Sequence, residues 1–280
     1  MKKFGFTLAE VLLTLSIVGV LAAVTIPGVV SSSSNDANAA RLAVTVSNIE
    51  NAMHSMIATE GVSNLYGTRA WGVAQKQDEK IGHSSSSGSA DGVPAFAGYL
   101  GQHLAINSFS KGSYIDYYGS NTSIRKLSGS KTYGEANEGG EATDYTGLGE
   151  TFPIELKNGA TMFIIVFPRG DQVSKTTQAE IDAIIELGGS LFSDAADIFI
   201  DVNGKQKPNT IGRDIFGFYL GADGVLYPCG GMDVGIYDSG TITHTWQNKD
   251  SSWACIDGVY YNSGWGCTAR LISNGYKFDY

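Results

Sequence analysis

The chain has 280 residues, of which 42% are hydrophobic and 17% are charged, and its formal net charge at pH 7 is -9. The hydrophobic share is enough to build a core, which excludes a broadly disordered chain, and the length suits one sizeable domain with an extended element. Because nucleic-acid affinity depends on lysine and arginine that neutralise phosphates, the acidic balance argues against a diffuse phosphate-binding role.

The first element in chain order is an apolar segment preceded by two lysines. Lys2 and Lys3 open the chain, and residues 6–30 contain a single acid, Glu10. About 20 apolar residues suffice to cross a bilayer, so this segment is predicted to span one. The lysines favour a cytoplasmic N-terminus, which places the rest of the chain on the opposite side of the membrane.

The start of the apolar segment also carries a cleavage motif. Gly5, Phe6, Thr7 and Glu10 stand in the stretch GFTLAE. This stretch resembles the motif of type IV prepilins and type II secretion pseudopilins. The resemblance implies that a membrane peptidase cuts after Gly5, removes residues 1–5 as a leader and N-methylates Phe6. A secretory cleavage site behind the apolar segment is a poorer match, because an Ile-Pro pair crowds it.

Glu10 is the residue that a plain membrane anchor does not need. A carboxylate within a membrane segment is costly, and it indicates a function and a partner. Cleavage creates an amine on Phe6, and in a bundle of subunits Glu10 of one chain would meet that amine on its neighbour. Since a wrong stagger would leave a charge unpaired in lipid, we expect the pair to set the register of assembly. The alternative is a single-pass anchor whose Glu10 reaches the membrane interface.

The helix is expected to continue from Phe6 to about Glu60 and to stop at Gly61, with an amphipathic second half. Its apolar positions recur at spacings of three and four: Ala39, Leu42, Val46, Ile49, Met53 and Met56. Weak helix formers predict a soft stretch between Pro27 and Asp36. The family resemblance implies a helix kink at Pro27.

Residues 61–280 are expected to form a globular extracytoplasmic head. Residues 61–150 are polar and rich in glycine, and SYIDYYG within them reads as strand or surface. Asn158-Gly159 between FPIEL and TMFIIVF predicts a hairpin, FGFYL and VLYP predict another across GADG, and DIFIDV reads as a strand. Thr177 is placed to cap a short helix. The predicted fold is α+β, a long N-terminal helix packed on an antiparallel sheet, which is also the lollipop shape that the pilin resemblance implies.

One acid-rich turn is a candidate calcium site. Asp201, Asn203 and Asp214 supply hard oxygen ligands of the kind that calcium prefers. Their spacing does not match an EF-hand, although the resemblance adds that some pseudopilins bind calcium in a C-terminal loop. The alternative is an Asx-rich turn between two strands, with Gly204 supplying a positive φ.

The cysteines all lie in the last quarter of the chain, and their spacing does not match a zinc site. In an exported domain one disulfide is the natural count, with Cys255–Cys267 as the preferred pair and a stabilisation of about 3 kcal/mol. Cys229 remains a possible partner for either cysteine. The resemblance implies a disulfide-bounded loop near the C-terminus. Nearby aromatic residues form a contact face or pack against the sheet: Trp253, Tyr260, Tyr261 and Trp265.

No catalytic motif is present in the sequence, so an enzyme is not expected. The resemblance implies a structural subunit of a type IV pilus or a type II secretion pseudopilus. Its partners would be copies of itself or related pilins, the prepilin peptidase and methyltransferase, and an inner-membrane assembly platform. It would reside in the inner membrane as a single-pass protein and then in a periplasmic pseudopilus or a cell-surface pilus. The alternatives are a minor tip-located pilin acting as an adhesin, and a membrane-anchored extracytoplasmic domain that does not polymerise.

Overall fold

The computed structural model describes residues 8–77, 80–82, 88–119, 124–127, 150–168, 194–231, 246–247, 254–256 and 264–280, with the backbone alone for residues 26–33. Several predictions lie outside these residues. They concern the cleavage site at Gly5 and Phe6, the helix capped by Thr177, and the aromatic residues Trp253, Tyr260 and Tyr261.

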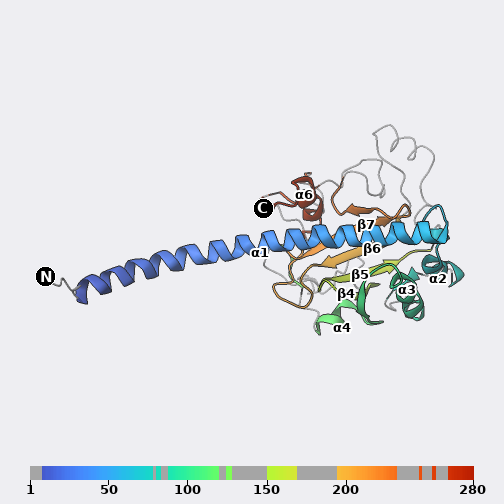
Figure 1. Ribbon diagram of the computed structural model, residues 1–280, viewed down its shortest axis with the longest axis horizontal. Helices are drawn as coiled ribbons and strands as arrows, with labels where there is room; N and C mark the ends of the chain where they lie inside the picture. Colours follow the sequence, from blue (N-terminus) through green and yellow to red (C-terminus); the bar gives the residue numbers. More distant parts are fainter. Residues whose placement is uncertain are drawn as a thin grey trace, which may run out of the picture.

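The dominant element is one long helix, α1, which runs from Leu8 to Glu60 (Figure 1). Its 53 residues are helical without a break at Pro27 or in the serine-rich stretch after it. At 1.5 Å per residue the helix is about 80 Å long. It ends as predicted at Gly61, which adopts a φ of 65°. There the N–H groups of Gly61 and Val62 donate to the carbonyls of Ala58 and Ile57, which is the Schellman pattern.

The head is built on an eight-stranded sheet with the order β2-β1-β5-β6-β7-β8, to which β4 adds on β5 and β3 on β4. The strands are β1 Lys80–Ile81, β2 Gly88–Ser89, β3 Ile106–Phe109, β4 Phe152–Leu156, β5 Thr161–Val166, β6 Asp194–Asp201, β7 Ile215–Gly221 and β8 Leu226–Pro228. All the pairings are antiparallel except the short pairing of β1 with β2. The α+β prediction, a long N-terminal helix and an antiparallel sheet, is confirmed at this level.

Both predicted hairpins are present. The turn between β4 and β5 uses Gly159 at a φ of 90°, and the Asn158 side chain accepts a hydrogen bond from the Ala160 N–H at 3.1 Å. The turn between β7 and β8 uses Gly224 at a φ of 89°. In both turns the glycine adopts a backbone conformation that residues with a Cβ rarely take. The strand predicted from DIFIDV is β6, which begins earlier, at Asp194.

The remaining described helices are short and mostly fall where the sequence analysis made no assignment. They are η1 Leu65–Gly67, α2 Arg69–Gln77, η2 Ala90–Gly92, α3 Val93–Leu100, α4 Tyr114–Tyr118 and α6 Cys267–Ser273. The segment SYIDYYG, read as strand or surface, is helix α4. The Asp116 carboxylate accepts a hydrogen bond from the Ser113 N–H at 2.8 Å, and Gly119 ends the helix at a φ of 78°.

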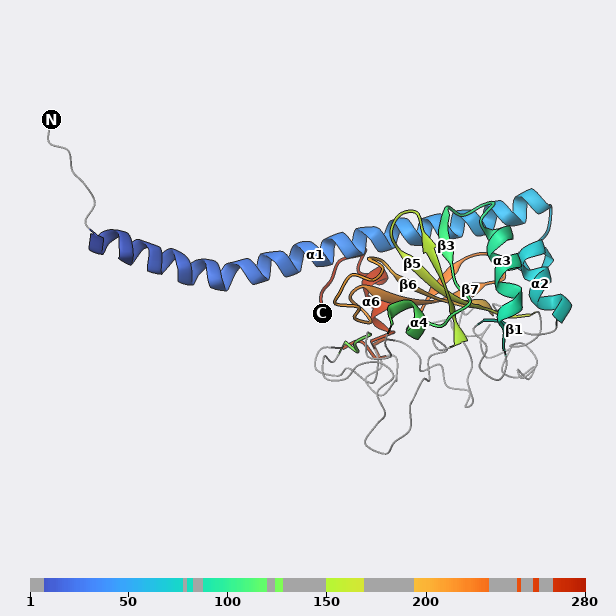
Figure 2. The same cartoon turned by 90° about the horizontal axis from the view of Figure 1, so that it is seen from below.

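Helix α1 crosses the sheet from one end to the other. At the end of the sheet that α1 reaches first along the chain, the Asn38 amide donates to the Arg213 carbonyl at 3.3 Å, and the Asn158 amide donates to Thr45 Oγ1 at 3.0 Å. Farther along α1, the Glu50 carboxylate accepts the Leu226 N–H at 3.0 Å. We call the first end the stalk end; it holds the turn 157–160 and the loop 202–214. Figures 1 and 2 show α1 leaving the head at this end.

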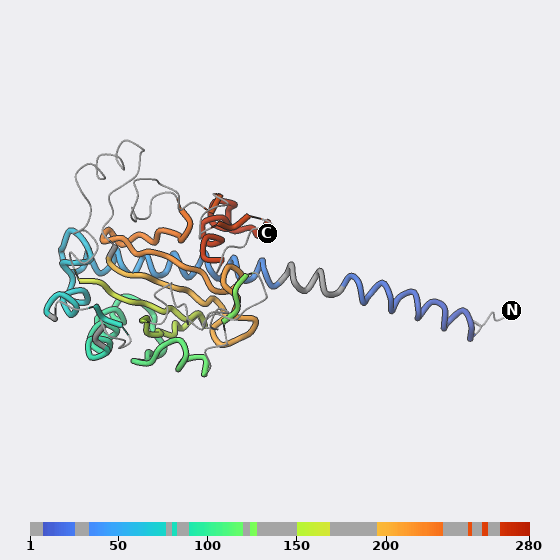
Figure 3. The backbone as a smooth tube through the Cα atoms, turned by 180° about the vertical axis from the view of Figure 1, so that it is seen from behind, coloured from blue at the N-terminus to red at the C-terminus, as the bar shows by residue number. Residues whose placement is uncertain are grey.

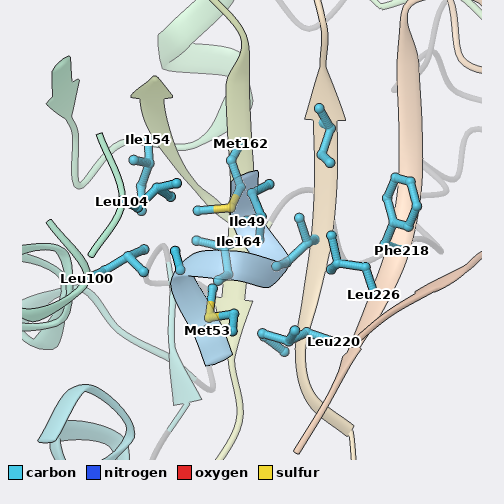
Figure 4. Close-up of a cluster of buried hydrophobic side chains, with 14 of the residues drawn as sticks. Ile49, Met53, Leu100, Leu104, Ile154, Met162, Ile164, Phe218, Leu220 and Leu226 are labelled. Atoms are coloured by element: carbon cyan, nitrogen blue, oxygen red, sulfur yellow. The ribbon is translucent and has the colours of Figure 1, made fainter. Parts of the chain in front are cut away.

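The main core lies between the second half of α1 and the sheet. Figure 4 shows Ile49 and Met53 of α1 lying among side chains from the sheet, including Met162 and Ile164 of β5. These four side chains are fully buried. The whole predicted stripe is buried: Ala39, Leu42, Val46, Ile49, Met53 and Met56. The prediction that this face packs on the protein's own head is therefore confirmed.

A smaller cluster covers the opposite face of the sheet. Phe163 and Phe199 point to that face, where Tyr117 of α4 lies 5.3 Å from the Phe163 ring and Trp265 lies 4.7 Å from the Phe199 ring. Trp265 is 1% exposed, so it packs against the sheet and does not form an open contact face. Strand β5 is buried at every position, which explains its nearly continuous apolar sequence TMFIIV, whereas β6 includes Asp194, Asp197 and Asp201.

Candidate functional site

The first half of α1 is an exposed apolar surface. The segment Leu8–Thr25 has a mean hydropathy of 2.2, and none of it is buried against the rest of the protein. Leu8 and Val24, near its two ends, are 77% and 75% exposed. Eighteen residues of helix extend about 27 Å, close to the hydrocarbon thickness of a bilayer. One helix of the described chain is therefore long and apolar enough to cross a membrane.

The polar side chains of this segment are suited to an apolar surrounding. The hydroxyls of Thr14, Ser16 and Thr25 donate to the carbonyls of Val11, Leu12 and Leu21 at 2.8 to 2.9 Å. Each hydroxyl is thereby satisfied within the helix, as hydrocarbon requires. Glu10 is the one ionisable residue between Leu8 and Thr25.

Glu10 lies on the first turn of α1 and is exposed. Its carboxylate is close to the helix N-terminus, where the partial positive charge of the helix favours an acid. Helix α1 projects from the head, and its first turn lies at the outer end of the projection (Figure 2). Glu10 therefore lies on the part of α1 that the head does not cover.

The candidate calcium residues do come together at the stalk end. Asp201 is the last residue of β6, and it pairs in register with Ile215 of β7, which directly follows Asp214. Both carboxylates are fully buried. The Asn203 N–H donates to Asp201 Oδ1 at 3.1 Å, and the Asn203 amide lies 3.3 Å from Asp214 Oδ2. When the oxygen and nitrogen of the Asn203 amide exchange places, the nitrogen donates to Asp201 Oδ1 at 2.8 Å.

The carboxylate oxygens already accept hydrogen bonds from the protein. Asp214 accepts the Asn209 N–H at 2.9 Å and the Thr210 N–H, one on each oxygen. Asp201 Oδ2 accepts the Tyr118 hydroxyl at 2.5 Å. Tyr118 comes from α4 and was not anticipated from the sequence, since 83 positions separate it from Asp201.

Burial dominates the electrostatics of this pair. It raises the pKa of Asp201 well above the usual value, with a further rise from Asp214, although the Tyr118 hydrogen bond acts in the opposite direction. Burial likewise raises the pKa of Asp214 from 3.8 to about 6, against the backbone N–H groups of Thr210 and Asn209, which lower it. Among the described residues no basic side chain forms an ion pair with either carboxylate. Burial therefore extends the pH range over which these acids keep their protons, although the donors around them favour the ionised form.

The protein's own donors satisfy these carboxylates without a cation. Each of the four carboxylate oxygens accepts at least one hydrogen bond from an N–H or O–H group of the protein. The part of the chain that the structure describes also has no group of three or more His, Cys, Asp or Glu placed to hold a metal. The Asx-turn alternative fits better, since Gly204 adopts a φ of 65° beside Asn203.

The C-terminal disulfide joins Cys255 and Cys267, whose Cα atoms are 5.0 Å apart. The preferred pairing is therefore confirmed. Cys229 is buried and is not part of this bond. Its carbonyl accepts the Ala269 N–H of α6 at 3.2 Å, so the strand end at Cys229 and the disulfide-bonded helix pack together.

Replacing Cys255 and Cys267 together with Ser is expected to lower the free energy of unfolding by about 3 kcal/mol, because the unfolded chain regains the freedom of the closed loop. Denaturant unfolding of the full chain in detergent would measure this. The matched control is Cys229→Ala, which leaves the disulfide intact. A double variant as stable as the wild type would contradict the expectation.

Arg270 of α6 holds the C-terminal tail, residues 274–280, in place. The sequence analysis did not predict this role for Arg270. Its guanidinium donates to Asp279 Oδ1 at 2.8 Å, to the Asp279 carbonyl at 2.9 Å and to the Cys255 carbonyl at 2.7 Å. It also lies 5.1 Å from the centre of the Tyr280 ring. The Tyr280 hydroxyl donates to the Gly212 carbonyl at 2.8 Å. The tail is thereby held against the loop 202–214 at the stalk end.

Comparison with known proteins adds no relative: no family model, no curated protein and no solved structure matches the chain.

Proposed function

We propose that this protein is a structural subunit of a type IV pilus or a type II secretion pseudopilus. The observation that carries the proposal is the division of a single helix. Its second half packs into the core of the head. Its first half, Leu8–Thr25, is apolar, and none of it is buried against the rest of the protein. Such a surface needs lipid or other apolar helices to cover it. The prepilin-like motif at Gly5 and Phe6 supports the choice of a polymer over a plain anchor.

In this proposal the apolar first half of α1 has two roles, one in the membrane and one in the filament. It first holds the subunit in the inner membrane, with Lys2 and Lys3 on the cytoplasmic side. After the peptidase cuts behind Gly5 and methylates Phe6, the same half leaves lipid and packs against copies of itself or related pilins on the assembly platform. Because the bundle excludes water, Glu10 then pairs with the amine on Phe6 of a neighbour and sets the stagger between subunits.

The purpose of the filament is not part of the proposal, because subunits of one design serve different filaments. Two other roles remain as outcomes of the test. A minor subunit at the tip would act as an adhesin and would be present in few copies. An extracytoplasmic domain that never polymerises would stay in the membrane fraction.

Replacing Glu10 with Ala is expected to leave cleavage intact but to lower the amount of subunit in sheared filaments by at least about tenfold, since the amine of Phe6 would lose its partner in the bundle. Mass spectrometry of the N-terminal peptide in membrane and sheared fractions measures both quantities.

The matched control is Thr14→Ala, which removes a polar group that is satisfied within its own helix. Normal incorporation of the Glu10→Ala subunit into filaments would overturn the assigned role of Glu10. Wild-type protein that retains Met1 would overturn the prepilin assignment itself.

A further inference from the structure

Charge is distributed unevenly over the head. The chain is acidic overall, with a net charge of -9, yet the stalk end gathers basic side chains. They come from the turn 157–160, the loop 202–214 and the segment 124–127, and we call them the basic patch: Arg125, Lys126, Lys157, Lys205, Lys207 and Arg213. Each of these side chains is exposed or half-buried.

Backbone contacts bring the three segments together. The Arg125 N–H donates to the Asn209 carbonyl at 2.8 Å, and the Ile211 N–H donates back to the Arg125 carbonyl at 3.0 Å. The two turns also touch, because a Cβ added to Gly204 would lie 3.1 Å from the Gly159 carbonyl oxygen. Figure 3 shows the loop 202–214 and the C-terminal segment at the end of the head from which α1 emerges.

The acids of the same loop do not neutralise the patch. Asp201 and Asp214, at the two ends of the loop, are fully buried and present no carboxylate to solvent. Among the described residues, the other acids of the stalk end are spread over four segments: Asp36 of α1, Asp116 of α4, Glu155 of β4 and Asp279 of the tail. Asp279 is paired with Arg270, which lies outside the patch. The loop therefore presents Lys205, Lys207 and Arg213 to solvent without an exposed acid of its own.

Aromatic rings hold two of the cations in place. The Lys205 amine lies 4.4 Å from the centre of the Tyr117 ring. The Arg213 guanidinium lies 5.5 Å from the Phe278 ring centre and 5.0 Å from that of Tyr280. Side chains held in this way lose less freedom when they bind an anion, so they suit a binding surface.

The position of the patch identifies its partner. Helix α1 leaves the head at the stalk end, so a membrane that holds Leu8–Thr25 lies on this side of the head. Between Thr25 and Asn38 there is about 20 Å of helix, of which lipid headgroups cover roughly 5–8 Å. The helix length left between the headgroups and the head is close to the Debye length of about 10 Å. A typical helix tilt of about 20° brings one side of the head closer to the membrane surface.

We propose that the basic patch rests on the anionic lipid headgroups of the bilayer in which α1 is anchored. The inference rests on the membrane anchoring in the proposed function and adds a lipid class to it. Anionic lipid attracts each basic side chain near the membrane surface, and the attraction disappears within a Debye length. The contact holds the membrane-stored subunit tilted, with its stalk end against the lipid, and it is broken when the subunit leaves the membrane.

The test compares amine accessibility of the full chain in two kinds of lipid nanodisc, each holding one chain. One disc contains phosphatidylcholine alone, and the other also contains phosphatidylglycerol. Acetic anhydride modifies exposed lysines, and mass spectrometry measures the rate at each site. Lys205 and Lys207 are expected to react at least about threefold more slowly in the anionic disc. At about 1 M salt, where the Debye length is about 3 Å, the difference should vanish.

Lys76 is the matched control, because it is exposed on α2 at the other end of the head (Figure 1). Its rate should be the same in both discs. The double variant Lys205→Gln with Lys207→Gln should weaken the protection of the neighbouring Lys126 and Lys157. The single variant Lys76→Gln should leave that protection unchanged.

Equal rates at Lys205 and Lys207 in both discs would overturn the inference while the anchoring stands. A chain that enters neither disc would overturn the anchoring itself, so the two failures are distinguishable. Protection in neutral discs by added duplex DNA, with none from anionic lipid, would assign the patch to nucleic acid. Protection that needs two chains in a disc would assign it to a second copy. Either of these results overturns the lipid assignment.

Discussion

The variant Ile49→Asp is expected to prevent the head from folding, or to lower its free energy of unfolding by more than about 4 kcal/mol. Ile49 is fully buried at the centre of the contact between α1 and the sheet (Figure 4). A carboxylate at this position would lie among apolar side chains such as Met162 and Ile164, where its charge has no partner. Thermal unfolding of the full chain in detergent, followed by near-ultraviolet circular dichroism, measures the effect.

The adjacent residue provides a matched control. Asn48 is exposed on the same helix, so Asn48→Asp introduces the same carboxylate one residue away but into water. We expect its effect on stability to stay within about 0.5 kcal/mol. If the two variants lose the same amount of stability, α1 does not pack on the sheet through this face, and the division of the helix into an exposed half and a core half is wrong.

The second large effect concerns pH. The Asp214 pKa is raised from 3.8 to about 6 by burial, so the folded head binds this proton more tightly than the unfolded chain does. The stability that the proton supplies is complete below pH 3.8 and is lost as the pH rises through about 6. The rise corresponds to about 3 kcal/mol. Asp201, whose pKa is also raised by burial, adds to the effect in the same direction.

The variant Asp214→Asn isolates this contribution, because its side chain is neutral at every pH. Relative to the wild type, the variant should gain about 3 kcal/mol of stability between about pH 4 and pH 7. Asp36→Asn is the matched control, since it removes one carboxylate that is exposed on α1. Denaturant unfolding at a series of pH values measures both. A constant difference between the wild type and Asp214→Asn across this range would show that the buried acid does not titrate as the structure indicates.

Short sequence patterns were sufficient to predict the buried face of α1, its C-terminal end and the first hairpin. The spacing of apolar residues from Ala39 to Met56 identified the buried face of α1, because an amphipathic helix repeats that spacing whatever it packs against. Gly61 marked the helix end, and Asn158-Gly159 marked the first hairpin, because both positions need a backbone conformation that glycine tolerates. The helices described within residues 61–150 were not predicted from such patterns, since they are short and rely on contacts with distant segments for stability.

The acid-rich turn shows the limit of the approach more sharply. Asp201, Asn203 and Asp214 were correctly expected to be neighbours, because a turn between two strands brings its ends together. Whether their oxygens face a cation or the protein's own donors depends on the Tyr118 hydroxyl and the N–H groups of Asn209 and Thr210. Residue types alone do not specify which donors surround these oxygens, because the donors come from distant parts of the chain.

The sequence by itself determined the apolar helix with its single acid and the strand-and-turn pattern of both hairpins, because each depends on residues close together in the chain. Only the tertiary structure decided that two aspartates are buried side by side, that Tyr118 donates to one of them, and that basic residues from three distant segments share the stalk end. These features depend on which surfaces the folded head brings together, and such long-range contacts are set by the packing of the whole chain.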